Sequence, residues 1–324
     1  MYYLGIDGGG SQTRALVCDG SGQVFGRGLS GPSNPRTATE SMLRENLLSA
    51  IQQAVSGIKI ARVHAAYFGV AGATDPINQE LILQIAHDFF QHQAPKITVG
   101  NDMEIALEGG LSGAPGLVLI AGTGSASYGR NAAGKTAQCG GWGDLVDDAG
   151  SGSWIGLEAL QTLVRQADGR LPKSSLMNAV VHFLGIEGMS DFKARIHDQG
   201  LARNERARLA PIVIDLAQSG DLLATQIVSR AVQELCRLVK IVNQKLELPR
   251  PSICLCGGLM QNPYFQDALC TALRLDGFES AVTCPHLQPV SGALMLALKS
   301  VNITVREQTI IELVKAQAIA PPNK

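Results

Sequence analysis

The sequence predicts an α/β fold in which one unit has been duplicated. An apolar run ends at Asp7 and is followed by Gly8-Gly9-Gly10-Ser11 and a second strand-like run. The same order returns farther along the chain, where Gly122-Thr123-Gly124-Ser125 separates two apolar runs. Each pair of strands opens a β-rich segment that is followed by helices, and this pattern is typical of an internal repeat.

The first half of the chain alternates strands and helices. A third strand is expected over 24–29, and Thr37 with Glu40 has the spacing of a capping box before a helix that runs to Val55. The elements that follow are a strand over 63–70, a helix over 77–90, a strand over 96–99 and a short helix over 103–107. The glycine-rich segment 109–116 is expected to form a boundary, so the predicted first domain is 1–112.

The second half is mostly helical and ends in a mixed segment. Helices are expected over 151–167, 173–184, 190–199, 204–219 and 222–246. A strand over 253–256 then leads into Gly257-Gly258, followed by a helix from 262, a strand over 281–283 and helices over 290–298 and 306–315. The predicted second domain is 113–299 with a helical insertion. The segment from about 300 to 324 is expected to pack back on the first domain, with residues 318–324 frayed.

Composition excludes several classes of protein. The net charge is −1, so the chain has no overall positive charge that would attract nucleic acid or an anionic membrane. Hydrophobic residues make up 45% of the sequence, which allows a sizeable core. No signal peptide and no membrane-spanning run are expected. The seven cysteines lack disulfide or zinc spacing, so we expect buried, reduced thiols in a cytoplasmic protein.

The glycine turns are candidate phosphate-binding loops. Glycine allows positive φ angles and lets backbone N–H groups approach a ligand, and Ser11 and Thr123 add hydroxyls. Neither a Walker A loop nor a dinucleotide fingerprint is present, and a plain hairpin turn is the alternative interpretation. The first hairpin carries Asp7 at the position where the second carries Ala121. Because Mg²⁺ takes one or two carboxylates together with phosphate oxygens, Asp7 is the expected Mg²⁺ ligand. Gly257-Gly258 suits a nucleoside lying against backbone.

Two further places carry candidate chemistry. Asp102 follows a strand and begins a helix. The Asn101-Asp102 pair there is either an N-cap, or Asp102 is the base that accepts a proton from an attacking hydroxyl. The span 140–154 holds both tryptophans, and Trp142 with Asp148 suits a sugar, since an indole stacks on the ring and a carboxylate accepts from hydroxyls. Trp154 fits better as a core residue.

The order of these motifs over nearly the whole chain resembles the actin, hexokinase and sugar-kinase superfold. Within it, the chain is similar to the N-acetylglucosamine kinase group of the BadF/BadG/BcrA/BcrD ATPases. The resemblance implies a duplicated ribonuclease H-like, two-domain fold with ATP in an interdomain cleft, and Asp102 as the base. It also implies phosphate contacts from Gly8, Gly9, Gly10, Ser11, Gly122, Thr123, Gly124 and Ser125, adenosine contacts from Gly257 and Gly258, and sugar contacts from Asn34, Asp102, Thr123, Gly141, Trp142 and Asp148.

The activity implied is transfer of the γ-phosphate of Mg²⁺-ATP to the C6 hydroxyl of N-acetylglucosamine. Asp147 and Ala149 depart from the Gly-Asp-Glu/Gln-Gly-Ser motif of the family, and this leaves open which amino sugar binds. Glucosamine and N-acetylmuramic acid are the alternative substrates, and an ATPase activator of a dehydratase or a non-catalytic sugar sensor are the alternative functions. The sequence does not determine the oligomeric state, and a homodimer is one of the alternatives.

Overall fold

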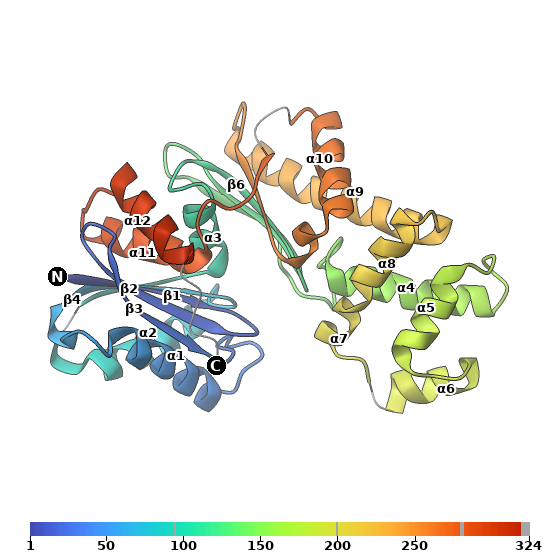
Figure 1. The fold of residues 1–324 in the computed structure, drawn as a ribbon, viewed down its shortest axis with the longest axis horizontal. Helices are drawn as coiled ribbons and strands as arrows, with labels where there is room; N and C mark the ends of the chain where they lie inside the picture. The colour runs from blue at the N-terminus through green and yellow to red at the C-terminus, as the bar shows by residue number, and fades with distance from the viewer. Residues whose placement is uncertain (94, 199, 279–281, 319–324) are drawn as a thin grey trace. The chain divides into compact units, whose positions relative to one another are not determined.

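The computed structural model describes residues 1–93, 95–198, 200–278 and 282–318 (Figure 1). The chain divides into two compact units. Unit 1 holds Met1–Pro115 together with the described residues from Cys284 onward, and unit 2 holds Gly116–Thr283. None of the helices in these described ranges is long and apolar enough to cross a membrane.

Unit 1 is built on a five-stranded mixed sheet. Its strands are β1 (Tyr2–Gly8), β2 (Thr13–Asp19), β3 (Val24–Ser30), β4 (Val63–Val70) and β5 (Lys96–Gly100), in the order β3-β2-β1-β4-β5. The first three strands form an antiparallel meander, whereas β4 and β5 run parallel to β1. The carboxyl ends of β1, β4 and β5 therefore meet at one edge of the sheet, which is where α/β proteins bind ligands.

Helices cover both faces of this sheet. The helices α1 (Glu40–Val55) and α2 (Pro76–Phe90) pack on one face, and α3 (Asp102–Gly110), α11 (Pro289–Ser300) and α12 (Glu307–Ala318) lie on the other (Figure 1). Short 3₁₀ turns occupy Ile60–Arg62 and Gln91–Gln93. The cap of α1 is Thr39, whose hydroxyl accepts from Met42 N, so the prediction that Thr37 begins this helix is wrong. One turn of chain, 34–38, comes before the cap instead.

The predicted end of the second domain at 299 differs from the structure. Residues from Cys284 belong to unit 1 because α11 packs closely on β1 and α3. A Cβ at Gly5 of β1 would lie 2.5 Å from Leu294 N, and a Cβ at Gly292 would overlap Ile105 O of α3. Glycine at both positions lets backbones touch, and this close packing ties α11 to the first sheet.

Unit 2 repeats the topology of unit 1. Its strands are β6 (Gly116–Ala121), β7 (Ser125–Arg130), β8 (Thr136–Gly140), β9 (Ile253–Cys256) and β10 (Val282–Thr283), in the order β10-β9-β6-β7-β8. Again three strands form an antiparallel meander, and two more run parallel to the first. The prediction of a duplicated α/β fold is confirmed. β8, a strand with polar and glycine residues, was not among the predicted elements.

The long helical segment of unit 2 lies between β8 and β9, and α10 follows β9. The α-helices described in unit 2 are α4 (Gly152–Ala167), α5 (Ser175–Leu184), α6 (Met189–Lys193), α7 (Arg203–Ala207), α8 (Leu209–Gln218), α9 (Leu222–Leu246) and α10 (Pro263–Leu275). A π turn occupies Ala194–Asp198, and a 3₁₀ turn occupies Gly258–Gln261. The helix predicted over 204–219 is therefore two helices, α7 and α8, which meet at Arg208.

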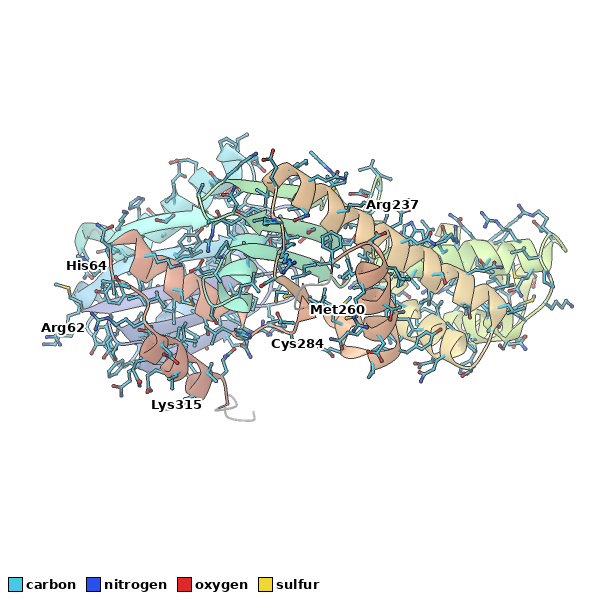
Figure 2. The ribbon with its side chains drawn as sticks, turned by 90° about the horizontal axis from the view of Figure 1, so that it is seen from above. Arg62, His64, Arg237, Met260, Cys284 and Lys315 are labelled. Atoms are coloured by element: carbon cyan, nitrogen blue, oxygen red, sulfur yellow. The ribbon has the colours of Figure 1, made fainter. Side chains whose placement is uncertain are left out.

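All seven cysteines are free thiols, as predicted. Cys18, Cys236 and Cys254 are buried and three others are partly buried. Cys284 is exposed, so the expectation of burial is wrong there (Figure 2). The Cys254 and Cys256 sulfurs lie 3.6 Å apart on one face of β9, as expected for alternate residues of a strand.

Candidate functional site

The first glycine hairpin connects β1 to β2. Gly9 N donates to Gln12 O across its tip at 3.0 Å. None of Gly8, Gly9 and Gly10 has a positive φ, so the left-handed backbone that glycine allows is not used here. Gly8 is required for another reason, because a Cβ there would lie 2.5 Å from Ser33 Oγ. Gly10 and Ser11 lie at the exposed tip, and a Cβ at Gly10 would meet no atom within 4 Å.

The loop after β3 is fastened to this hairpin. Ser33 N donates to Gly9 O at 3.0 Å, and Thr13 Oγ1 lies 2.7 Å from Ser33 Oγ. The next residue, Asn34, is a predicted sugar contact. Its side-chain oxygen accepts from Arg36 N at 2.9 Å and lies against Gly72, in the turn that follows β4. Asn34 is therefore held beside the carboxyl edge of the unit 1 sheet.

Asp7 and Asp102 lie at this same edge. The strand register aligns Asp7 with Gly69 of β4, and Gly69 with Gly100 of β5, so Asp102 follows the aligned row by two residues. Asn101 is the N-cap of α3, and its side chain accepts from Glu104 N at 2.8 Å. The Asn101-Asp102 pair therefore supplies the expected N-cap through Asn101, and the Asp102 carboxylate in the first turn is left out of that cap.

Burial dominates the electrostatics of this pair. It raises the pKa of Asp7 to about 6, against the opposing effect of the Arg14 guanidinium, whose Nη1 lies 3.5 Å from Asp7 Oδ2. The negative charge of Asp102 adds to the rise in the Asp7 pKa. Burial also raises the pKa of Asp102, although the N–H groups of Asp102 and Met103 oppose it. Two neighbouring carboxylates with raised pKa values are typical of functional sites.

The second glycine hairpin and the third glycine turn lie together in unit 2. Gly122 N donates to Gly124 O at 2.9 Å, and the carbonyls of Gly122 and Thr123 accept from the first N–H groups of α4. The parallel pairing of β6 with β9 brings Gly257 beside this hairpin. Gly257 has a φ of +103°, and a Cβ there would overlap Ala121 O, whereas Gly258 is open.

A cluster of two arginines and two aspartates lies next to the second hairpin. Asp148 is 1% exposed, and its carboxylate accepts from Ser125 N at 3.3 Å and pairs with Arg203 of α7. Burial raises the pKa of Asp148, and Arg203 opposes that rise. Arg203 and Arg206 both pair with Asp144. Nothing local to these arginines in the sequence indicates that their partners lie 55 or more residues away.

The loop between β8 and α4 carries the remaining predicted sugar contacts. Gly141 has a φ of +80°, its N–H donates to Ser125 O at 3.0 Å, and this bond fixes the start of the loop beside the second hairpin. Trp142 is 81% exposed, so it is not a core residue. Trp154, by contrast, is partly buried against the core, with Arg230 5.5 Å from its ring centre.

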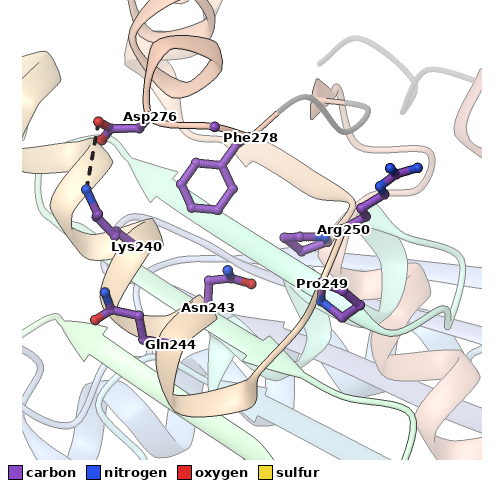
Figure 3. A pocket seen from close by; sticks show the side chains of 9 residues that line it. Lys240, Asn243, Gln244, Pro249, Arg250, Asp276 and Phe278 are labelled. Atoms are coloured by element: carbon purple, nitrogen blue, oxygen red, sulfur yellow. Dashed lines mark ion pairs between the residues drawn. The ribbon is translucent and has the colours of Figure 1, made fainter.

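A separate cavity of about 260 Å³ lies elsewhere in unit 2 (Figure 3). It is lined by the end of α9, the segment before β9 and the end of α10, and Lys240 and Asp276 form an ion pair at its rim. The cavity lies toward the amino end of β9, whereas Gly257 follows the carboxyl end. None of the predicted site residues lines it. Within the described ranges, no three acidic, histidine or cysteine side chains form a ready-made metal site.

Comparison with known proteins gives matches over nearly the whole chain. The model of the BadF/BadG/BcrA/BcrD ATPase family matches residues 4–297. The N-acetylmuramic acid/N-acetylglucosamine kinase of Clostridium acetobutylicum is 31% identical over 301 residues, which are 91% of this chain and 98% of that protein. The N-acetyl-D-glucosamine kinase of Dictyostelium discoideum is 27% identical over 92% of this chain and 98% of its own. A crystal structure from Chromobacterium violaceum, assigned as an N-acetylglucosamine kinase, matches with a TM-score of 0.70 and 27% identity over 91% of this chain and 98% of that one.

Proposed function

The chain belongs to the BadF/BadG/BcrA/BcrD ATPase family, and on that premise we propose that it is an ATP-dependent amino-sugar kinase. The proposed reaction transfers the γ-phosphate of ATP to the C6 hydroxyl of N-acetylglucosamine. Similarity to proteins named as kinases of N-acetylglucosamine and N-acetylmuramic acid supports the substrate class. Glucosamine and N-acetylmuramic acid remain the competing substrates because Ala149 departs from the family motif.

The observation that carries the proposal is the pair of carboxylates at the edge of the unit 1 sheet. Asp102 is free of the capping bond that Asn101 makes, and burial raises its pKa. A carboxylate with a raised pKa is a stronger base, and a general base works best when its pKa approaches the working pH. The burial and the raised pKa of Asp102 therefore support its role as the base in phosphoryl transfer to a hydroxyl.

The proposed step has Asp102 accept the proton of the sugar C6 hydroxyl as that oxygen attacks the γ-phosphorus. The bond from the γ-phosphorus to the β–γ bridging oxygen breaks, and ADP leaves. We assign the exposed N–H groups at Gly10 and Ser11, and those of Thr123 and Gly124, to the phosphates. The N–H groups of Gly122 and Ser125 donate to Gly124 O and to Asp148 instead. Gly258 contacts the adenosine. Asn34 and Trp142 contact the sugar, while Asp148, whose carboxylate is engaged by Ser125 N and Arg203, holds the second hairpin in place.

The donor set at Asp7 fits Mg²⁺. This ion takes one or two carboxylates plus phosphate oxygens and keeps several waters, so a site needs few protein ligands. Asp7 offers a carboxylate beside the exposed hairpin. Burial and the charge of Asp102 raise the pKa of Asp7, and a cation bound there would relieve the repulsion between the two carboxylates. Bound there, Mg²⁺ would neutralise charge on the phosphates.

The test is sugar-dependent ADP release by the Asp102→Asn variant. We expect a loss of about 10²–10⁴-fold in rate, because that is what a positioned general base contributes, with ATP binding retained. Asp88→Asn is the control, since Asp88 is an exposed carboxylate that pairs with Arg44, and it should keep full activity. Activity of Asp102→Asn within about tenfold of wild type would refute the base assignment.

The same assay identifies the substrate. Glucose, glucosamine, N-acetylglucosamine and N-acetylmuramic acid are compared, together with a reaction that contains no sugar. N-Acetylglucosamine should give the highest kcat/KM. ADP release that no sugar stimulates would contradict kinase activity and would favour the ATPase activator.

A further inference from the structure

The cluster of Arg203, Arg206, Asp144 and Asp148 is not explained by the reaction itself. Arg203 and Arg206 are three residues apart on α7, so they share one face of that helix. Their charges meet two aspartates of the segment that leads from β8 to α4. The cluster therefore connects a short helix to the second hairpin.

Arg203 lies against the hairpin, whereas the ion pair of Arg206 is with Asp144 alone among the two aspartates. A Cβ at Gly124 would overlap Nη2 of Arg203 and would lie 2.9 Å from Asp148 Oδ2. Gly124 does not have a positive φ. A side chain at Gly124 would have to displace this guanidinium or the Asp148 carboxylate from the hairpin.

Asp148 connects Arg203 to the Ser125 amide of the hairpin. One carboxylate oxygen pairs with Arg203, and the other accepts from Ser125 N. Asp148 also has a φ of +57°, a left-handed conformation that costs free energy in a non-glycine residue. Burial of the Asp148 carboxylate and its left-handed backbone both cost free energy, and the ion pair with Arg203 offsets this cost.

We propose that Arg203 is a positioning residue that, through Asp148, holds the hairpin over 122–125 in the conformation that binds ATP. This inference rests on the proposed function. Arg203 needs no contact with the nucleotide for this role. Without the guanidinium, the buried Asp148 carboxylate loses its partner and no longer holds the Ser125 amide in place.

The test measures the Kd of a non-hydrolysable ATP analogue with Mg²⁺ by calorimetry, and the KM for ATP, on the full chain. Arg203→Gln should raise both by about tenfold or more, the size expected for directly coupled groups. Arg206→Gln is the matched control, because it removes a neighbouring arginine from the same helix face and the same Asp144. It should leave both values for ATP within about threefold.

A double-mutant cycle separates positioning from general loss of structure. Asp148→Asn in the Arg203→Gln background should weaken ATP binding less than the product of the two single effects, because no buried charge is left unpaired. This double variant also serves if Arg203→Gln does not fold. Multiplicative effects, an unchanged Kd in Arg203→Gln, or an equal effect of Arg206→Gln would each overturn the proposal.

The two proposals fail in different ways. If the wild type phosphorylates a sugar and Arg203→Gln binds ATP normally, the positioning role is wrong and the kinase stands. If ATP binding depends on Arg203 while no sugar is phosphorylated, the kinase is wrong and the positioning role stands.

Discussion

Replacing Asp7 by Asn should stabilise the ligand-free protein at neutral and alkaline pH. The pKa of Asp7 is about 6 in the folded protein, against an ordinary value of 3.8, chiefly because burial disfavours its charge. The folded state therefore holds this proton more tightly than the unfolded state, and stability falls as pH rises from about 4 to about 6. Above that window the ionised carboxylate costs about 3 kcal/mol, at 1.36 kcal/mol per pKa unit. The value already includes the opposing attraction of Arg14.

Thermal unfolding with a chelator present measures this effect. For a unit of roughly 150 residues, about 3 kcal/mol corresponds to a rise in Tm of roughly 6–12 °C at pH 8. Near pH 4 the gain should nearly vanish, because the carboxyl is then largely neutral in the folded state. A rise that is the same at both pH values, or a fall at pH 8, would refute the argument. Asp88→Asn, at an exposed carboxylate, should change Tm little at either pH.

The remaining predictions concern exposed positions of the proposed site. Gly10→Ala should leave Tm unchanged, because a Cβ there meets no atom within 4 Å and φ is not positive, but it should raise the KM for ATP about tenfold if phosphate approaches that backbone. An unchanged KM would remove Gly10 from the phosphate site. Trp142→Ala should likewise leave Tm within about 2 °C, since the side chain is 81% exposed, and should raise the KM for the sugar about tenfold or more. A fall in Tm without a change in KM would make Trp142 structural.

Local patterns predicted most secondary structure because hydrophobic periodicity is a local property. Short apolar runs predict β4 and β9, and apolar positions at every third or fourth residue predict α9. All three have the predicted bounds, Val63–Val70, Ile253–Cys256 and Leu222–Leu246. The strand–glycine–strand pattern also repeats in the sequence. The two sheets have the same topology because both copies of that pattern fold alike.

Part of the site was also predictable from local patterns, because strand ends can be recognised in the sequence. Asp7 and Asp102 each follow or end a strand, and parallel strands bring such residues to a common edge. The role of Asn101 could not be assigned in advance, because Asn101 and Asp102 are both good caps and only backbone geometry shows which one is used.

By itself, the sequence determined the α/β class, the duplication and the glycine turns and aspartates that follow several of the strands. Only the tertiary structure decided why particular glycines are needed and which charges pair. Gly8 makes room for Ser33, and Gly124 makes room for Arg203. It also placed α11 in unit 1, where backbones meet at Gly292. Such contacts join residues that are tens to hundreds of positions apart, so no local pattern of apolar or glycine residues can encode them.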